Sequence, residues 1–185
     1  TLIFRPEATA AEAAKRSFLA ANALFQALAI YIPPEKLALK WPNDVLLSGG
    51  KVAGILLESS GLGPFVDWLS IGIGVNLKHT PEGVQDASFA PTSLAAAGGE
   101  DVSPKEFLST LADAYATQEA KLLRLGFGRI RDDWLANAAR LGEVITARTG
   151  REDVTGIFDS IDRDGNLVLI TGTGPRAIPA ADVFF

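Results

Sequence analysis

The sequence predicts an α+β fold with a small all-β unit at its C-terminal end. In residues 1–139, segments with helical periodicity alternate with short apolar segments bounded by Gly and Pro, which is typical of helices and strands mixed along one chain. Residues 140–185 contain short strand-like segments separated by turn residues, and their number is sufficient for a small barrel. We therefore expect two units, over residues 1–139 and 140–185.

Helix boundaries in the first unit follow from capping residues. Thr9 and Glu12 have the spacing of a capping box, and so do Ser103 and Glu106. Pro33-Pro34 ends the first helix, and Gly126 and Gly128 are expected to separate the last two. The predicted helices cover residues 10–32, a short segment from Pro91 to Gly98, 103–125 and 130–139.

The strands are predicted from apolar runs between turn residues. In the first unit they cover residues 1–5, 37–40, 45–47, 52–57 and 65–76, with Gly49-Gly50 as a hairpin turn. In the second unit they cover 144–148, 154–161, 167–170 and a last piece near Val183, with residues 162–166 as a turn. Residues 81–91 are predicted to form a loop.

Composition narrows the class of protein. The 185 residues are 48% hydrophobic and 21% charged, which favours a folded globular protein over a disordered one. Cysteine is absent, so disulfides and thiolate sites are excluded. The net charge of −5 has no basic block, and we therefore expect no nucleic-acid partner. No apolar run is long enough for a membrane span, and we expect no membrane partner.

The first candidate site is the run Lys-Trp-Pro-Asn-Asp at positions 40–44. Pro42 cannot donate to a sheet, so the chain is expected to leave the strand there, with Asn43 and Asp44 in a turn. Lys40 then offers a compact charge for a phosphate or carboxylate, and would stabilise negative charge that develops during phosphoryl or acyl transfer. Alternatively, Lys40 is a solvated lysine at a strand end and the turn has no function.

Two glycine-containing runs are further candidates. Alternating Gly72 and Gly74 leave one face of a strand without side chains, so a flat ligand could lie against the backbone, and Asn76 could present its amide to a purine. In the hairpin, Lys51 would be a second cation and Gly54 another point of close approach. The alternatives are close packing of strand and helix, a turn-forming Asn76 and an exposed hairpin lysine. His79 is the sole histidine and is expected to be exposed, so we expect no metal site.

Together these runs resemble the biotin protein ligase family. They occur in the family's order: Lys-Trp-Pro-Asn-Asp at 40–44, Gly-Gly-Lys-Val-Ala-Gly-Ile-Leu-Leu-Glu at 49–58, Gly-Ile-Gly-Val-Asn-Leu at 72–77 and Thr-Ser-Leu at 92–94. The resemblance covers essentially the whole chain. It implies a class II synthetase-like mixed sheet with helices on one face, followed by an SH3-like C-terminal domain.

The resemblance implies a two-step ligase. Biotin and ATP would form biotinyl-5′-AMP with the assistance of Mg²⁺, and the biotinyl group would pass to a lysine of a carboxylase's biotin carboxyl carrier domain. Lys40 matches the family's essential lysine, and Asn76 matches the residue that reads adenine. Gly72 and Gly74 match the strand on which biotin packs, while Asn43, Asp44, Lys51 and Gly54 match positions that line the site.

The sequence also departs from the family. The family's Gly-Arg-Gly-Arg loop, which covers biotin and the adenylate, does not occur in these residues. We expect it to precede Thr1, and we expect these residues alone to be a poor ligase. A non-catalytic relative that binds biotin or adenylate is the main alternative, and Trp41-Pro42 disfavours a lipoate ligase. We expect a cytoplasmic protein, and a homodimer through exposed sheet edges is compatible with the pattern.

Overall fold

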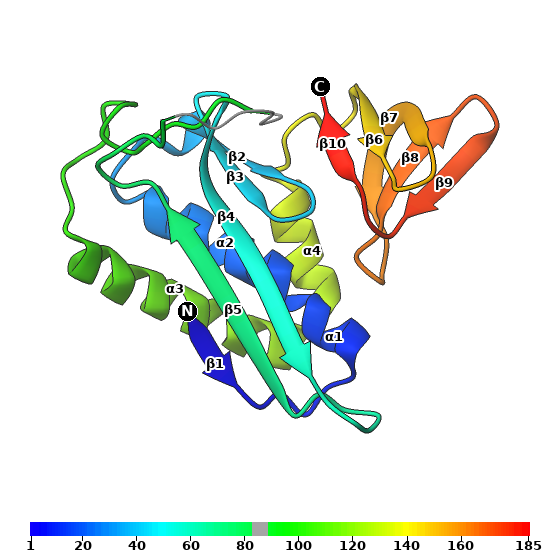
Figure 1. Ribbon diagram of the computed structural model, residues 1–185, viewed down its shortest axis with the longest axis horizontal. Coiled ribbons are helices and arrows are strands. Elements are labelled where there is room, and N and C mark those ends of the chain that lie inside the picture. Colours follow the sequence, from blue (N-terminus) through cyan, green and yellow to red (C-terminus); the bar gives the residue numbers. More distant parts are fainter. Residues whose placement is uncertain (83–88) are drawn as a thin grey trace.

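Two five-stranded antiparallel sheets are present in the computed structural model, which describes residues 1–82 and 89–185 (Figure 1). The main sheet has the order β1-β5-β4-β3-β2 and consists of β1 (Leu2–Phe4), β2 (Leu37–Lys40), β3 (Asp44–Leu47), β4 (Gly50–Ser60) and β5 (Trp68–Val75). The second sheet has the order β10-β6-β7-β8-β9 and consists of β6 (Val144–Arg148), β7 (Asp153–Ile161), β8 (Leu167–Thr171), β9 (Gly174–Ile178) and β10 (Asp182–Phe184).

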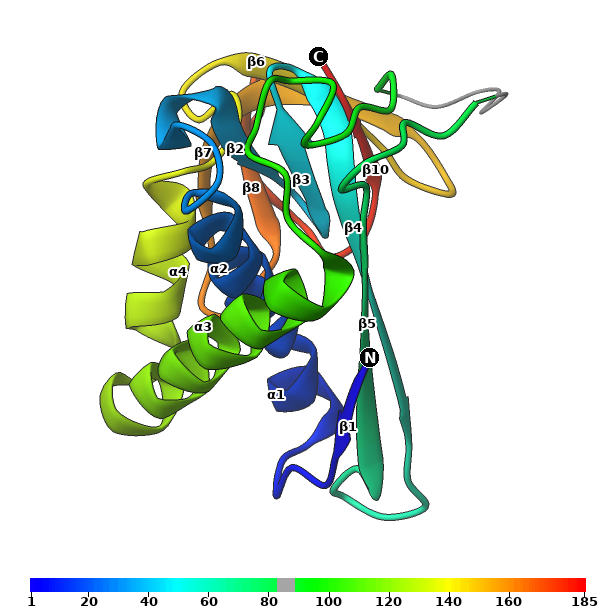
Figure 2. The same cartoon turned by 90° about the vertical axis from the view of Figure 1, so that its left-hand side faces the viewer.

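The helices cover one face of the main sheet and leave the other face open (Figure 2). They are α1 (Ala10–Ala14), α2 (Arg16–Leu28), the 3₁₀ turn η1 (Pro34–Lys36), α3 (Pro104–Leu125) and α4 (Phe127–Leu135). Helix α2 lies at the centre of the core, where Leu19, Leu24 and Leu28 are fully buried. Both predicted capping boxes are present, at the starts of α1 and α3. None of the helices in the described ranges is long and apolar enough to cross a membrane.

A row of aromatic side chains, called the aromatic chain below, joins the two sheets. The ring of Phe18 on α2 lies 5.4 Å from that of Trp134 on α4, and the Trp134 ring lies 6.5 Å from that of Phe158 on β7. Trp41, which follows β2, donates from Nε1 to the carbonyl oxygen of Gly165 in the β7–β8 turn, at 3.2 Å. These aromatic contacts and the partly buried hydrogen bond hold the second sheet beside the β2 end of the first.

The α+β fold and the small C-terminal β unit are confirmed, but the main sheet is antiparallel where we expected a mixed one. Strands β2 to β5 follow one another through short connections, and such connections produce antiparallel neighbours. In the second sheet β9 and β10 are edges that do not pair with each other, so hydrogen bonds do not close it into a barrel. The division at residues 139 and 140 stays a prediction.

Several element boundaries differ from the prediction. The expected helix over residues 10–32 is interrupted at Lys15 and ends at Leu28, because the hydrogen bonds tighten to three-residue turns at both places. The segment after Pro91 forms turns instead of a helix, and Gly128 lies inside α4. Strand β9 was not predicted, since Gly174 and Pro175 are both unusual in strands. Part of the predicted loop at 81–91 lies outside the described residues.

The aromatic chain generates a stability prediction. Phe158→Ala should lower the free energy of unfolding by about 3–5 kcal/mol, because it leaves a cavity beneath Trp134. The midpoint of urea denaturation measures this loss. Ile157→Ala is the matched control on the same strand, since Ile157 is 44% exposed. An equal loss in both variants would contradict the assignment of Phe158 as the link between the sheets.

Candidate functional site

The predicted site residues form a row across the open face of the main sheet. Lys40 pairs with Asp44, Asp44 pairs with Gly54, and Gly54 pairs with Gly74. Residues that are paired across neighbouring strands share one face of a sheet. Their neighbours along the strands, such as Leu39, point into the helical core instead. The row therefore carries a cation, a carboxylate and then two positions without side chains.

A β-bulge adds Lys51 to this face. The pairing of β3 with β4 shifts between Val45 and Leu46, so one extra residue of β4 is accommodated. Val52 and Ala53 are both buried, and Lys51 thereby comes to lie on the same side as Gly54. Without the bulge, the alternation of a strand would turn Lys51 toward the helices.

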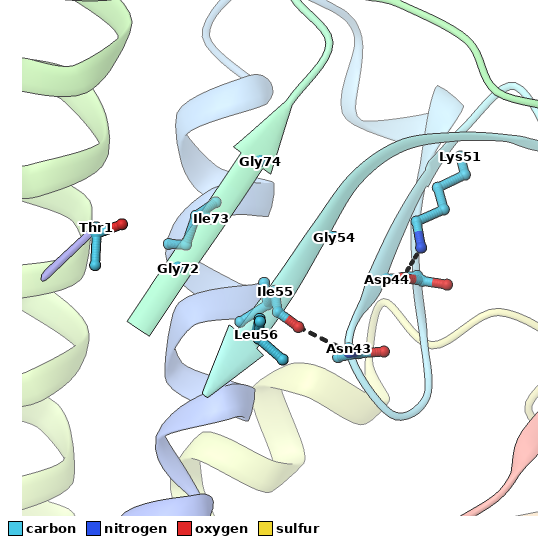
Figure 3. A pocket seen from close by; sticks show the side chains of 10 residues that line it. All are labelled: Thr1, Asn43, Asp44, Lys51, Gly54, Ile55, Leu56, Gly72, Ile73 and Gly74. Carbon is cyan, nitrogen blue, oxygen red and sulfur yellow. Dashed lines mark hydrogen bonds and ion pairs between the residues drawn. The ribbon is translucent and has the colours of Figure 1, made fainter. Parts of the chain in front are cut away.

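Two adjoining hollows lie over this part of the sheet, with volumes of about 400 and 570 Å³. Lys51, Gly54 and Gly74 line both hollows, so the two form one continuous depression. Figure 3 shows the first, which is also lined by Thr1, Asn43, Asp44, Ile55, Leu56, Gly72 and Ile73. The second is also lined by Ala53, Val75, Asn76, Pro81, Phe89 and Pro91. These volumes are within the range of small-molecule sites.

Lys40 is buried at one end of the row, with 6% of its surface exposed. Its Nζ lies 3.5 Å from Asp44 Oδ2 and 5.1 Å from the centre of the Phe89 ring. Burial lowers the pKa of the Lys40 ammonium below its usual value, and the negative charges of Asp44 and Asp182 oppose this shift. A weakly hydrated, fixed cation of this kind interacts strongly with an anion that reaches it.

Asp44 is shared between two lysines. Its Oδ2 faces Lys40, and its Oδ1 lies 2.6 Å from Nζ of Lys51, in an ion pair that lacks the alignment of a hydrogen bond. The side chain of Lys51 is 44% exposed, so a ligand in the hollow can reach its ammonium. Asp44 is thus shared, and the exposed ammonium of Lys51 is the cation that an anionic ligand in the hollow would meet.

The three site glycines have different reasons to be glycine. A Cβ on Gly54 would lie 3.3 Å from Cε and 3.4 Å from Nζ of Lys51, so a side chain there would press on the ion pair with Asp44. A Cβ on Gly72 would make only ordinary contacts, and one on Gly74 would have no neighbour within 4 Å. Neither of these two has a positive φ. Since glycine weakens a strand, the free space above Gly72 and Gly74 supports close approach of a ligand.

The two asparagines make internal hydrogen bonds. Asn43 donates from Nδ2 to the main-chain carbonyl oxygen of Ile55 at 2.7 Å. The main-chain carbonyl oxygen of Asn43 in turn accepts from the Ile55 N–H at 2.9 Å. Asn76 donates from Nδ2 to the carbonyl oxygen of Thr92 at 2.9 Å. Asn43 thus ties the turn before β3 to β4, and Asn76 ties the end of β5 to the segment that follows Phe89.

Seven of the eight predicted residues line the two hollows, and Lys40 is paired with one of them, Asp44, but lines neither hollow. The structure also adds one residue that we did not predict. Phe89 contacts Lys40 from a segment that the sequence marks only as a loop, and neither periodicity nor a motif distinguishes it. His79 is exposed, as expected, and Glu58 is exposed as well. Among the described residues, no group of three or more His, Cys, Asp or Glu side chains could hold a metal ion.

Known proteins resemble the chain along its whole length. The Biotin/lipoate A/B protein ligase family model matches residues 1–136, and the model of the Biotin protein ligase C terminal domain matches residues 141–185. The chain is 52% identical to a biotin–[acetyl-CoA-carboxylase] ligase of Paracoccus denitrificans, covering 100% of this chain and 78% of that protein. It is 31% identical to the bifunctional ligase/repressor BirA of Bacillus subtilis, and the match spans 56% of that relative's length.

Solved structures share the fold. The biotin protein ligase of Aquifex aeolicus in complex with biotin and ATP has a TM-score of 0.78 at 24% identity, covering 98% of this chain and 75% of that one. A biotin protein ligase-like protein of unknown function from a Silicibacter species has a TM-score of 0.78 at 25% identity, covering 96% and 76%. With the two family matches and the Paracoccus relative, these findings show that the chain belongs to the biotin protein ligase family.

Proposed function

We propose that this protein is a biotin–[acetyl-CoA-carboxylase] ligase. It activates biotin with ATP to biotinyl-5′-AMP and transfers the biotinyl group to a lysine of a carboxylase's carrier domain. The observation that carries the proposal is the row from Lys40 to Gly74, which places a buried cation beside an open glycine floor. The similarity to the ligase of Paracoccus denitrificans supports the same activity.

In the first step, a carboxylate oxygen of biotin attacks the α-phosphorus of ATP. A new P–O bond forms, and the bond to the bridging oxygen breaks so that pyrophosphate leaves with the electron pair. Negative charge grows on the oxygens around phosphorus in the transition state, and Lys40 stabilises it more than it stabilises the separated reactants. Lys51 supplies a second cation at the mouth of the hollow.

In the second step, the neutral amine of the carrier lysine attacks the carbonyl carbon of the mixed anhydride. An amide bond forms, AMP leaves with the electron pair of the broken C–O bond, and the amine's proton passes to solvent. Lys40 then faces the leaving phosphate and stabilises its charge. The same residue thus serves both steps, because both develop negative charge at the α-phosphate.

We place biotin against Gly72 and Gly74, where added side chains would meet only ordinary contacts or open space. Adenine is placed beside Asn76 in the second hollow. Because Nδ2 of Asn76 already donates to Thr92, we assign its amide oxygen to the adenine amino group. Asn43, Asp44 and Gly54 are assigned to the wall and floor that hold the two lysines in place.

The residues of the site do not fit a resident Mg²⁺ ion. Asp44 already contacts two lysines, and the described residues contain no metal-binding cluster. We therefore write Mg²⁺ as part of the substrate, bound to the phosphates of ATP as is usual for this ion. A cytoplasmic location and a homodimer also remain proposals.

Replacement of Lys40 tests its role in activation. Lys40→Met should lower biotin-dependent exchange between ATP and pyrophosphate by roughly 10²–10³-fold, because a buried charge that acts mainly in the transition state is lost. Lys36→Met is the control, since Lys36 is an exposed lysine outside the row. Full exchange activity in the Lys40 variant would overturn the assignment.

Binding and activity assays on the protein without substitutions distinguish a ligase from a non-catalytic relative. In the intact protein, tight binding of biotin in calorimetry, without any exchange or transfer to a carrier domain, would support a binding protein and sink the ligase proposal. Transfer of lipoate in place of biotin would sink the choice of substrate.

The glycine floor generates a separate prediction. Gly74→Val should fold normally, because Val favours strands and the new side chain meets no neighbour. It should weaken biotin binding by about 1–3 kcal/mol, since the side chain occupies space assigned to the ligand. Titration calorimetry measures the change. Gly150→Val is the control, because Gly150 also has open space around it and lies outside the row. Unchanged biotin affinity in the Gly74 variant would rule out this placement.

A further inference from the structure

A line of contacting side chains leads from the site lysine into the second sheet. Nζ of Lys40 lies 5.1 Å from the centre of the Phe89 ring, and the Phe89 ring lies 4.8 Å from that of Phe185. On the other side, the Arg140 guanidinium lies 5.1 Å from the centre of the Phe185 ring. These groups come from β2, the segment before Thr92, the residue after β10 and the connection between α4 and β6. Figure 1 shows β10 on the side of the second sheet that faces the main sheet.

The backbone of Phe89 is anchored close by, but its ring is not. The carbonyl oxygen of Ala90 accepts from the N–H of Lys51 at 2.9 Å, and the N–H of Thr92 donates to the Lys51 carbonyl at 3.0 Å. These bonds fix the chain next to Phe89 on β4. The direction of the aromatic ring then depends on what packs against it, and among the described residues Lys40 and Phe185 lie against it.

Phe185, in contrast, is held from two directions. The preceding residues pair with β6, as Val183 with Ala147 and Phe184 with Thr146, and Val183 is buried in the second sheet. Arg140 lies over its ring and is itself fixed by an ion pair of 2.7 Å with Glu143. Phe185, although 40% exposed, is therefore attached to the second sheet and has Arg140 on one side and the ring of Phe89 on the other.

We infer that Phe185 is a positioning residue for the ligase site, which acts by holding the Phe89 ring over the ammonium of Lys40. The ring lies against the ammonium of Lys40 and helps to exclude water from it, and an aromatic face attracts a cation most strongly where water is excluded. The second sheet thereby contributes to the site without touching the substrate. Its importance for catalysis rests on the proposed function, but the stacking itself does not.

A second residue of the β10 segment, Asp182, also influences Lys40. The negative charge of Asp182 raises the pKa of Lys40, although burial outweighs it, and Asp44 raises it as well. The other charged group that acts on Lys40 is Lys51, which lowers the pKa. The strand that carries Phe185 thus also supplies part of the electrostatic environment of the buried cation.

A simpler role for Phe185 is adhesion between the two sheets. Both roles predict a loss of stability when the ring is removed, so stability alone cannot separate them. They differ in the state of Lys40 in protein that remains folded. Positioning requires that Lys40 become more accessible, whereas adhesion leaves it unchanged.

Competitive acetylation of lysines by acetic anhydride, followed by peptide mass spectrometry, measures this accessibility. Relative to the exposed Lys105, Lys40 should react roughly fivefold faster in Phe185→Ala than in the unmodified protein, the factor expected for loss of one aromatic contact. Phe185→Tyr keeps a ring and should restore the original rate. Phe184→Ala is the matched control, because Phe184 contacts Arg148 instead of Phe89.

The outcomes are distinct. An unchanged Lys40 rate in folded Phe185→Ala, or an equal increase in Phe184→Ala, would overturn the inference. If Phe185→Ala does not fold by circular dichroism, Phe185→Leu replaces it, because it keeps an apolar side chain and lacks only the ring. The labelling does not require ligase activity, so it tests the stack even if the proposed function fails.

Exchange kinetics test the catalytic part. Phe185→Ala should lower kcat per active site, counted by the burst of pyrophosphate, by roughly fivefold with a smaller change in KM for ATP. Phe185→Tyr should restore kcat. A normal kcat together with faster labelling of Lys40 would show that the shielding exists but does not serve the reaction, and would overturn the catalytic part of the inference.

Discussion

The burial of the Lys40 ammonium is the constraint on which the rest of the site depends. Burial of an unpaired cation is strongly unfavourable in free energy, so the groups around it must replace the water that it loses. Asp44 does so from the opposite strand and Phe89 from above. Both contacts require the pairing of β2 with β3 in one register, because a slip of one residue would turn Lys40 into the helical core. The turn at Trp41 to Asn43, held by the Asn43 bonds to Ile55, fixes that register.

Much of this could be read from the sequence because it depends on local chemistry. The capping boxes at Thr9 and Ser103, the end of β2 at Pro42 and the glycine alternation on β5 are set by residues near one another in the chain. Cross-strand alternation then places Lys40, Asp44, Gly54 and Gly74 on one face. The resemblance to a known family pointed to the same positions. The family matches confirmed that the chain belongs to that family, while the roles of the individual positions stay predictions.

What could not be predicted depends on contacts between distant segments. Nothing in the sequence around Phe89 or Phe185 indicates that their rings meet, since 95 residues, which include the whole second sheet, lie between them along the chain. No sequence pattern predicted the β-bulge at Val52 either, yet this bulge determines on which face of the sheet Lys51 lies. Strand β9 was missed because sheet edges tolerate Gly and Pro that a central strand would exclude.

The bare stretch at Gly72 and Gly74 has a consequence for selectivity. A surface made of backbone has no rotamers to freeze and no side chains to rearrange, so a ligand that settles on it loses little to the ordering of the protein. The same surface is chemically uniform and discriminates by thickness and flatness alone. Under the proposed function, recognition of particular functional groups is then left to Lys51, Asn76 and Phe89, which line the second hollow. Shape and chemical identity are read by different parts of the depression, and each can change in evolution without disturbing the other.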